Sequence, residues 1–182
     1  MQHYQLPFEK TNAFSSLFLE YFSEESKLSN FIDFEPSAEG LRDAVDSWKF
    51  DDSKRNILVE VLKKQNISKS DGVCKNIELL ENKNTFTVTT GHQLNLVTGP
   101  LYFIYKIIST IKLAEYLTKE FPDKNFVPVY WMASEDHDFQ EINHFHLFGK
   151  KNIWETNQKG AVGAFSLEGV DEVLDNINEA FL

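Results

Sequence analysis

The sequence predicts an α/β fold preceded by helical segments, and three observations along the chain lead to this prediction. Residues 85–90 are β-branched and aromatic, as expected of a strand. A helical pattern of apolar residues then runs from Pro100 to about residue 121. Residues 126–133 are apolar without alternation, which is typical of a strand buried on both faces of a parallel sheet. Strand, helix and buried strand form a βαβ unit, whose strands are parallel and whose crossover is right-handed.

The composition is that of a globular protein, and it changes near residue 84. The chain has 182 residues, of which 42% are hydrophobic and 25% charged, so it can bury a sizeable core. Residues 1–83 are expected to form helical segments that pack on the core. Residues 84–182 are expected to form the first part of the α/β core itself.

Three helices are predicted before the first strand. Apolar spacing places one near residues 14–22, a second with Ser53 as its cap, and a third that begins at Ser70-Asp71. The stripe expected to be buried in the second helix consists of Ile57, Leu58, Val61 and Leu62.

The helix between the two strands is expected to start at Pro100, which suits a first helical turn, with Thr98 or Gly99 as cap. Lys106 is expected to lie off its buried stripe. The predicted stripe consists of Ile104, Ile107, Ile108, Ile111, Ala114 and Leu117.

Shorter patterns follow residue 144. Strands are predicted at residues 146–148, 152–154 and 161–165. A last helix is predicted from Val170 to Phe181, and its inward residues are expected to be Val173, Leu174, Ile177 and Phe181.

The charge balance limits the classes of partner. With 18 basic and 28 acidic residues the formal net charge is −10, so nucleic acid and anionic membranes are not expected as partners. The start of the chain lacks the pattern of a signal peptide, and no apolar run approaches the about 18 residues of a membrane span. The single cysteine, Cys74, excludes a disulfide within the chain and favours a reducing, cytoplasmic location.

Two polar clusters follow the two predicted strands, where parallel α/β sheets bind ligands. The first is Thr90-Gly91-His92-Gln93. A glycine permits a sharp turn and a close ligand, and the free amides at the start of the next helix suit a phosphate or a carboxylate. The alternative is a tight turn with a histidine that faces solvent. The loop matches neither the dinucleotide-binding nor the Walker A pattern.

The second cluster is Ser134-Glu135-Asp136-His137-Asp138. Asp136 and Asp138 suit magnesium, whose ligands are oxygen atoms. His137, His144 and His146 could instead belong to the metal site of a hydrolase, although no H-E-x-x-H motif is present. The alternative is structural: Asp136 or Asp138 caps a short helix through Phe139 and Ile142.

Several segments, in this order, closely resemble the bacillithiol biosynthesis cysteine-adding enzymes. They are residues 90–102 (Thr-Gly-His-Gln-Leu-Asn-Leu-Val-Thr-Gly-Pro-Leu-Tyr), 106–109 (Lys-Ile-Ile-Ser), 127–139 and 141–143. The opening Leu6-Pro7 before phenylalanine-rich helices is also similar. The family usually has Gln where this chain has His92, so the resemblance does not imply that the imidazole is essential.

The resemblance implies a Rossmann-like core and, in the full-length protein, inserted segments and a long coiled coil that forms a homodimer. Family members are about three times as long as this chain, on the usual multi-domain scale. The resemblance covers the whole of this chain but only the N-terminal third of the family. The chain also shows no sustained heptad pattern, so it is expected to be a fragment that is inactive alone.

The implied reaction joins the amino group of cysteine to the malyl carboxylate of glucosaminyl-malate, in the last step of bacillithiol synthesis. ATP and magnesium are implied as possible activators, through an acyl-adenylate or an acyl-phosphate. His137, Asp136 and Asp138 would be catalytic. The binding residues would be Thr90, Gly91, His92, Gln93, Thr98, Gly99, Ser134 and Glu135. A metal-dependent hydrolase and a non-catalytic nucleotide-binding module remain the alternatives.

Overall fold

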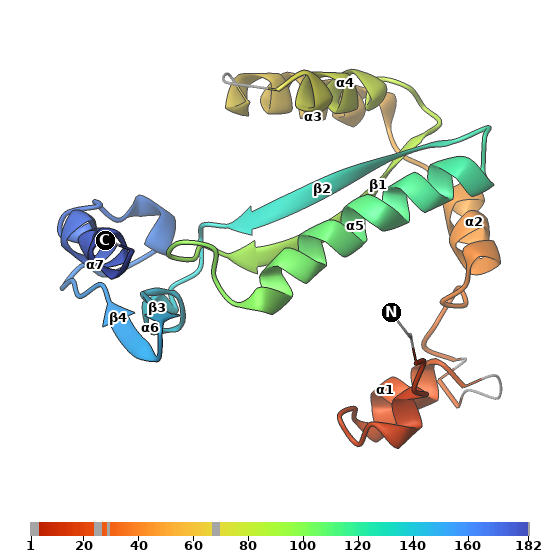
Figure 1. Ribbon diagram of the computed structural model, residues 1–182. Helices are drawn as coiled ribbons and strands as arrows, with labels where there is room; N and C mark the ends of the chain where they lie inside the picture. Colours follow the sequence, from red (N-terminus) through yellow and green to blue (C-terminus); the bar gives the residue numbers. More distant parts are fainter. Residues whose placement is uncertain (1–3, 24–26, 29, 67–69, 182) are drawn as a thin grey trace. The chain divides into compact units, whose positions relative to one another are not determined.

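The computed structural model describes residues 4–23, 27–28, 30–66 and 70–181. The chain divides into two compact units, residues 1–61 and residues 62–182. Figure 1 colours the chain along its sequence, from red at the N-terminus to blue at the C-terminus.

The first unit is made of short helices whose starts are set by polar caps. The Ser15 side chain accepts a hydrogen bond from the amide of Phe18 at 3.2 Å, and Ser37 accepts one from the amide of Gly40 at 3.0 Å. The elements are η1 (Phe8–Lys10), α1 (Ser16–Tyr21), α2 (Ala38–Ser47) and the first part of α3 (Asp52–Gln65).

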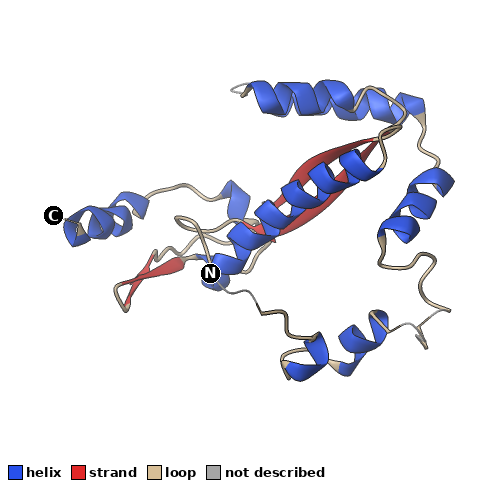
Figure 2. Ribbon diagram, turned by 45° about the vertical axis from the view of Figure 1, so that its right-hand side comes forward, coloured by secondary structure: helices blue, strands red, loops and turns tan. Residues whose placement is uncertain are grey.

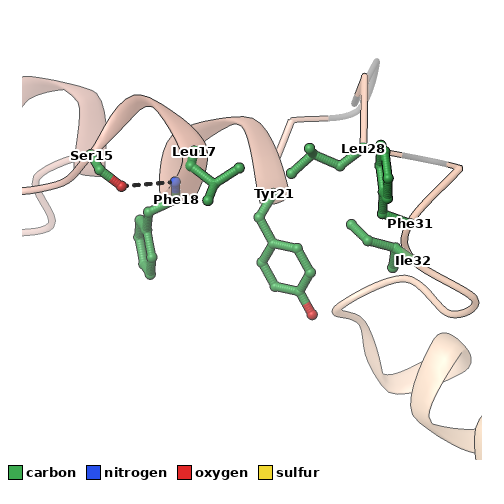
Figure 3. A pocket seen from close by; sticks show the side chains of 7 residues that line it. All are labelled: Ser15, Leu17, Phe18, Tyr21, Leu28, Phe31 and Ile32. Carbon is green, nitrogen blue, oxygen red and sulfur yellow. Dashed lines mark hydrogen bonds between the residues drawn. The ribbon is translucent and has the colours of Figure 1, made fainter.

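Aromatic rings dominate the start of this unit. Phe14 and Phe18 stack with their ring centroids 4.4 Å apart, and the rings of Phe8 and Phe22 pack against Phe18. Beside them lies an open pocket of about 630 Å³, which Figure 3 shows from close by. Its lining residues are Ser15, Leu17, Phe18, Tyr21, Leu28, Phe31 and Ile32.

Helix α3 differs from the prediction in its cap and in its buried face. The carboxylate of Asp51, not Ser53, accepts the Ser53 amide at 2.7 Å. Val59 and Arg55 are the buried side chains, and the Arg55 guanidinium lies 5.3 Å from the centre of the Phe50 ring. In the stripe expected to be buried, Ile57, Leu58 and Val61 are exposed. The pattern located the helix, but the neighbouring elements decide which side is covered.

The second unit contains the predicted βαβ arrangement. Strands β1 (Thr85–Gln93) and β2 (Asn125–Ala133) are parallel, with Thr85 opposite Asn125 and Gln93 opposite Ala133. Helix α5 (Leu101–Glu120) connects them and packs along both, as Figure 2 shows. The prediction of an α/β fold with parallel strands is confirmed.

The face of α5 that meets the sheet corrects the predicted stripe. Ala114 and Leu117 are each 2% exposed and Ile107 is half-buried, as expected. Ile104, Ile108 and Ile111 are instead 38%, 49% and 39% exposed. Their place toward the sheet is taken by Phe103, Lys106 and Thr110, which are half-buried. The helix has more apolar residues than one sheet face covers, so periodicity alone misjudged its orientation.

Helix α4 (Asp71–Leu79) follows Ser70, as predicted, and its residue Cys74 is a half-buried free thiol. Ile77 and Leu80 are buried. The hydroxyl of Thr85 donates to the Leu79 carbonyl at 2.6 Å, which joins the end of this helix to the start of β1.

In the C-terminal part, the first two predicted strands are present but lie about two residues earlier, and they pair as an antiparallel hairpin. Phe148 and Gly149 have positive φ angles of 47° and 81° in the turn between β3 and β4, as type I′ hairpin turns require. The predicted strand at residues 161–165 is wrong, because this segment forms a 3₁₀ helix. The elements are α6 (Phe139–Ile142), β3 (His144–Leu147), β4 (Lys150–Ile153), η2 (Val162–Ala164) and α7 (Val170–Ala180).

A small core holds these last elements together. Trp154, Val170 and Val173 are buried, and the indole N–H of Trp154 donates to the Glu168 carbonyl at 3.0 Å. Phe181, which was expected to point inward, is 70% exposed because it lies just beyond the end of α7. Among the described residues, no helix combines the length and the apolar character needed to cross a membrane.

We predict that Leu117→Ala lowers the free energy of unfolding of a polypeptide of residues 1–182 by about 2–5 kcal/mol, because it opens a cavity between α5 and the sheet. Ile108→Ala, on the same helix but 49% exposed, should cost much less. Urea unfolding followed by circular dichroism measures both. Equal losses for the two variants would contradict the orientation of α5 described above.

Candidate functional site

The parallel register brings the two polar clusters to one edge of the sheet. Gln93 ends β1 opposite Ala133, which ends β2, and neighbouring strands lie about 4.8 Å apart. The chain leaves β1 through the loop to α5 and leaves β2 through residues 134–138. Side chains of both segments therefore lie within reach of each other.

One side chain joins the clusters directly. The amide nitrogen Nε2 of Gln93 lies 3.1 Å from Oδ2 of Asp136 and 3.2 Å from Oε2 of Glu141. Glu141 belongs to the short helix α6, so a single amide connects the end of β1, the loop after β2 and α6. Two carboxylates are thereby held close together on one hydrogen-bond donor.

The loop after β2 is held in place by η2. The amide of Val162 donates to the carbonyl of Asp136, and the amide of Gly163 donates to the carbonyl of Ser134, both at 2.8 Å. A Cβ atom at Gly163 would lie only 2.5 Å from that of Ser134, so this close approach requires glycine. The predicted strand at residues 161–165 thus proves to be a support for the site.

Hydrogen bonds favour the ionised form of Asp136. The backbone N–H of Asp138 donates to Oδ1 at 2.9 Å, and this bond, followed by the Gln93 amide, lowers the pKa of Asp136 below its ordinary value of 3.8. Asp136 therefore carries its negative charge at neutral pH, where Gln93 can donate to it.

His92 takes part in a different set of contacts. Its Nε2 lies 2.6 Å from the hydroxyl of Tyr102 and its ring packs edge-on against Phe103, both on α5. Its Nδ1 lies 3.2 Å from Nδ2 of Asn95. Successive residues of a strand point to opposite faces, so His92 faces α5 while Gln93 reaches Asp136.

Two further residues lie on the α5 side of this strand end. The hydroxyl of Tyr130 donates to the His92 carbonyl at 3.1 Å, and burial raises the pKa of Tyr130 above its ordinary value of 10.0. The ammonium of Lys106 donates to the carbonyl oxygen of Gly91. Side chains from β1, β2 and α5 thus surround the end of β1 on this face.

The loop into α5 has the features of an anion site. Pro100 itself occupies the N-cap position, in place of the expected Thr98 or Gly99, and no side chain caps the helix there. The amide of Phe103 donates to the Pro100 carbonyl at 2.9 Å, which leaves the amides of Leu101 and Tyr102 for a ligand. Gly99 has a φ of +62°, and Asn95 lies where a Cβ atom would be, which explains the glycine.

The side chains of the remaining predicted site residues contribute no hydrogen bond to Gln93 or Asp136 within the described residues, although the backbone N–H of Asp138 donates to Asp136. Thr90 lies within β1, and the side chains of Thr98, Glu135, His137 and Asp138 are exposed. In the part of the chain that the structure describes, no hydrogen bond links these four side chains to Gln93 or Asp136.

The two histidines of β3 lie close together. The ring centroids of His144 and His146 lie 5.6 Å apart, and residues two apart in a strand point to the same face. Burial, and then the charges of Lys151 and His146, lower the pKa of His144 below 6.5. No group of three or more His, Cys, Asp or Glu side chains suited to a metal ion occurs within the described residues.

Asn95, Lys106 and Glu141 belong to the site in the structure but were not predicted as site residues from the sequence. The helical spacing offered one signal, because Tyr102 and Lys106 are four residues apart and share a face near the start of α5. No sequence pattern indicated Glu141, because its contact with Gln93 depends on how α6 packs.

We predict that Gln93→Ala raises the pKa of Asp136 toward 3.8, because it removes one of the donors to the carboxylate. The folded pKa is depressed, so ionised Asp136 contributes stability above its ordinary pKa, and this contribution disappears as the pH falls through the folded value. NMR titration of the carboxyl carbon measures the shift. Gln140→Ala, which removes a glutamine that does not contact Asp136, serves as the control and should leave the pKa unchanged.

Comparison with known proteins shows the family to which the chain belongs. Residues 1–181 match the family model "Bacillithiol biosynthesis BshC, N-terminal Rossmann-like domain". A protein of Flavobacterium psychrophilum is 49% identical over 91% of this chain and 32% of its own length. One of Christiangramia forsetii is 49% identical over 92% and 33%, and one of Bacillus cereus is 31% identical over 89% and 31%. All three bear the name "Putative cysteine ligase BshC".

The chain spans about a third of the length of these relatives, and the match begins at the first residue and runs through the βαβ unit and the site. The resemblance seen in the sequence is thereby confirmed. The chain belongs to the BshC family of bacillithiol biosynthesis, and residues 1–181 correspond to its N-terminal Rossmann-like domain.

Proposed function

We propose that the full-length protein containing this chain joins the amino group of cysteine to the malyl carboxylate of glucosaminyl-malate. The product is an amide, and the step completes bacillithiol. The observation that carries the proposal is the contact of Gln93 with both Asp136 and Glu141, at the carboxyl ends of two parallel strands. Membership of the BshC family supports it.

A carboxylate is a poor acylating agent, so the malyl carboxylate must first be activated, and we propose ATP as the activator. The free amides at the start of α5, with Thr98 and Gly99 before them, would bind phosphate or carboxylate oxygens. Thr90, Gly91 and His92 would line the same side of the site.

The carboxylates of Asp136 and Glu141 both accept hydrogen bonds from Nε2 of Gln93, so they lie close to each other. Magnesium binds one or two protein carboxylates and completes its shell with water and phosphate oxygens, so this pair fits an ion that accompanies a nucleotide. Such an ion would neutralise phosphate charge. Asp138 lies beside the pair in the same loop.

The same carboxylates suit the other reactant, the ammonium group of cysteine. The amine attacks the activated carbonyl carbon only after losing a proton. His137, adjacent to Asp136, is the proposed base because an imidazole is the side chain that most often transfers protons in catalysis. As the carbon–nitrogen bond forms, the phosphate or adenylate leaves with the electrons of its bond. Ser134 and Glu135 would contact the substrates from the loop.

The partners proposed for the full-length protein are these small molecules and a second copy of itself. The homodimer would form through a coiled coil outside residues 1–182. We also propose a cytoplasmic location, since a reducing compartment keeps the cysteine substrate and Cys74 as thiols.

Full-length protein with glucosaminyl-malate, cysteine and ATP should yield bacillithiol by mass spectrometry, and the nucleotide product should distinguish adenylate from phosphate transfer. Gln93→Ala and Asp136→Asn should each lower kcat/KM about 100-fold or more, as expected for groups that orient reactants or move protons. Gln140→Ala is the matched control and should retain normal activity.

Residues 1–182 alone should form no product. Normal kcat and KM in both Gln93→Ala and Asp136→Asn would show that the chemistry takes place elsewhere in the protein.

A further inference from the structure

Lys106 occupies an unusual place for a lysine. It is half-buried on the face of α5 that meets the sheet, between the buried Ala114–Leu117 end of that face and the start of the helix. Exposed isoleucines at positions 104, 108 and 111 lie on the same helix, so the chain places a charged residue toward the sheet and apolar residues toward solvent. Helix–sheet packing alone favours the reverse.

The ammonium of Lys106 reaches the end of β1, where it donates to the carbonyl oxygen of Gly91. Within the described part of the chain this is its one hydrogen bond. An ammonium has three donors, so two N–H groups remain for a ligand. Holding a cation in a half-buried position with one neutral acceptor is costly, and an anionic partner would offset that cost.

The negative and positive side chains of the site lie on different sides of the end of β1. Asp136 and Glu141 lie on the side that Gln93 faces, whereas Lys106 shares the α5 side with His92 and Tyr102. Tyr102 and Phe103, which contact His92, precede Lys106 by about one helical turn, so these groups line one stretch of α5. A positive charge is thus available on this side, beside the paired His92 and Tyr102, in a protein whose formal net charge is −10.

We propose that Lys106 binds an oxyanion of the substrates, either the malyl carboxylate or the phosphate that activates it. The inference rests on the function proposed above and adds a residue to it. Lys106 makes no covalent bond: it neutralises one negative charge of the bound group and stabilises the oxygen that becomes more negative when the amine attacks.

The test uses the full-length enzyme with Lys106→Met, which keeps the length of the side chain and removes its charge. Lys106→Arg restores the charge. Lys112→Met, on the same helix at an exposed position whose ammonium pairs with Glu115, is the matched control. The measurements are KM for each substrate, kcat, and calorimetric Kd values for glucosaminyl-malate and for ATP.

Lys106→Met should raise Kd about tenfold or more for one anionic ligand, the loss expected for a charge-assisted hydrogen bond, while KM for cysteine stays unchanged. An effect on glucosaminyl-malate identifies the carboxylate as the bound group, and an effect on ATP identifies the phosphate. Lys106→Arg should recover most of the affinity, and Lys112→Met should behave as wild type.

Unchanged Kd values for both anions in Lys106→Met would overturn the inference and leave the proposed function intact. An equal loss for all three substrates with a lowered melting temperature would also overturn it, because it would mark a structural role. If the wild-type protein binds the anions but makes no amide, the proposed function is wrong. The Kd values of the Lys106 variants then still test whether Lys106 binds an anion. Wild-type protein that binds neither anion would refute both.

Discussion

The register between β1 and β2 is the constraint on which the rest of the site depends. Pairing Thr85 with Asn125 makes both strands end at the same level, at Gln93 and Ala133. A shift by one residue would turn Gln93 to the opposite face and away from Asp136. Helix α5 fixes the register from one side, because Leu117 and Ala114 fill the space between it and the strands.

Local patterns predicted the elements well, since strands and helices are encoded by nearby residues. The run at 126–133 and the β-branched run at 85–90 became the two parallel strands. Patterns did not predict which faces are covered, as α3 and α5 demonstrate, because an apolar stripe does not say which neighbour buries it. The segment 161–165 has the composition of a strand, but Val162 and Gly163 instead use their amides to hold the loop after β2.

The site was predictable to the extent that topology places strand ends together. The sequence put two polar clusters after two strands, and parallel pairing joined them through Gln93 and Asp136. The contacts of individual side chains could not be predicted from the sequence. His92 and Gln93 are adjacent in the chain, yet His92 contacts Tyr102 and Gln93 contacts Glu141. Lys106 was expected to lie away from the sheet, and only the packing of α5 placed its ammonium at Gly91.

The central claim is that substrates meet at the common end of β1 and β2. A crystal structure of the full-length protein with glucosaminyl-malate and a non-hydrolysable ATP analogue tests it most directly. We expect ligand density within hydrogen-bond distance of Gln93 or Asp136, with an anionic group at the start of α5. Density for both ligands at a site remote from these strand ends would contradict it.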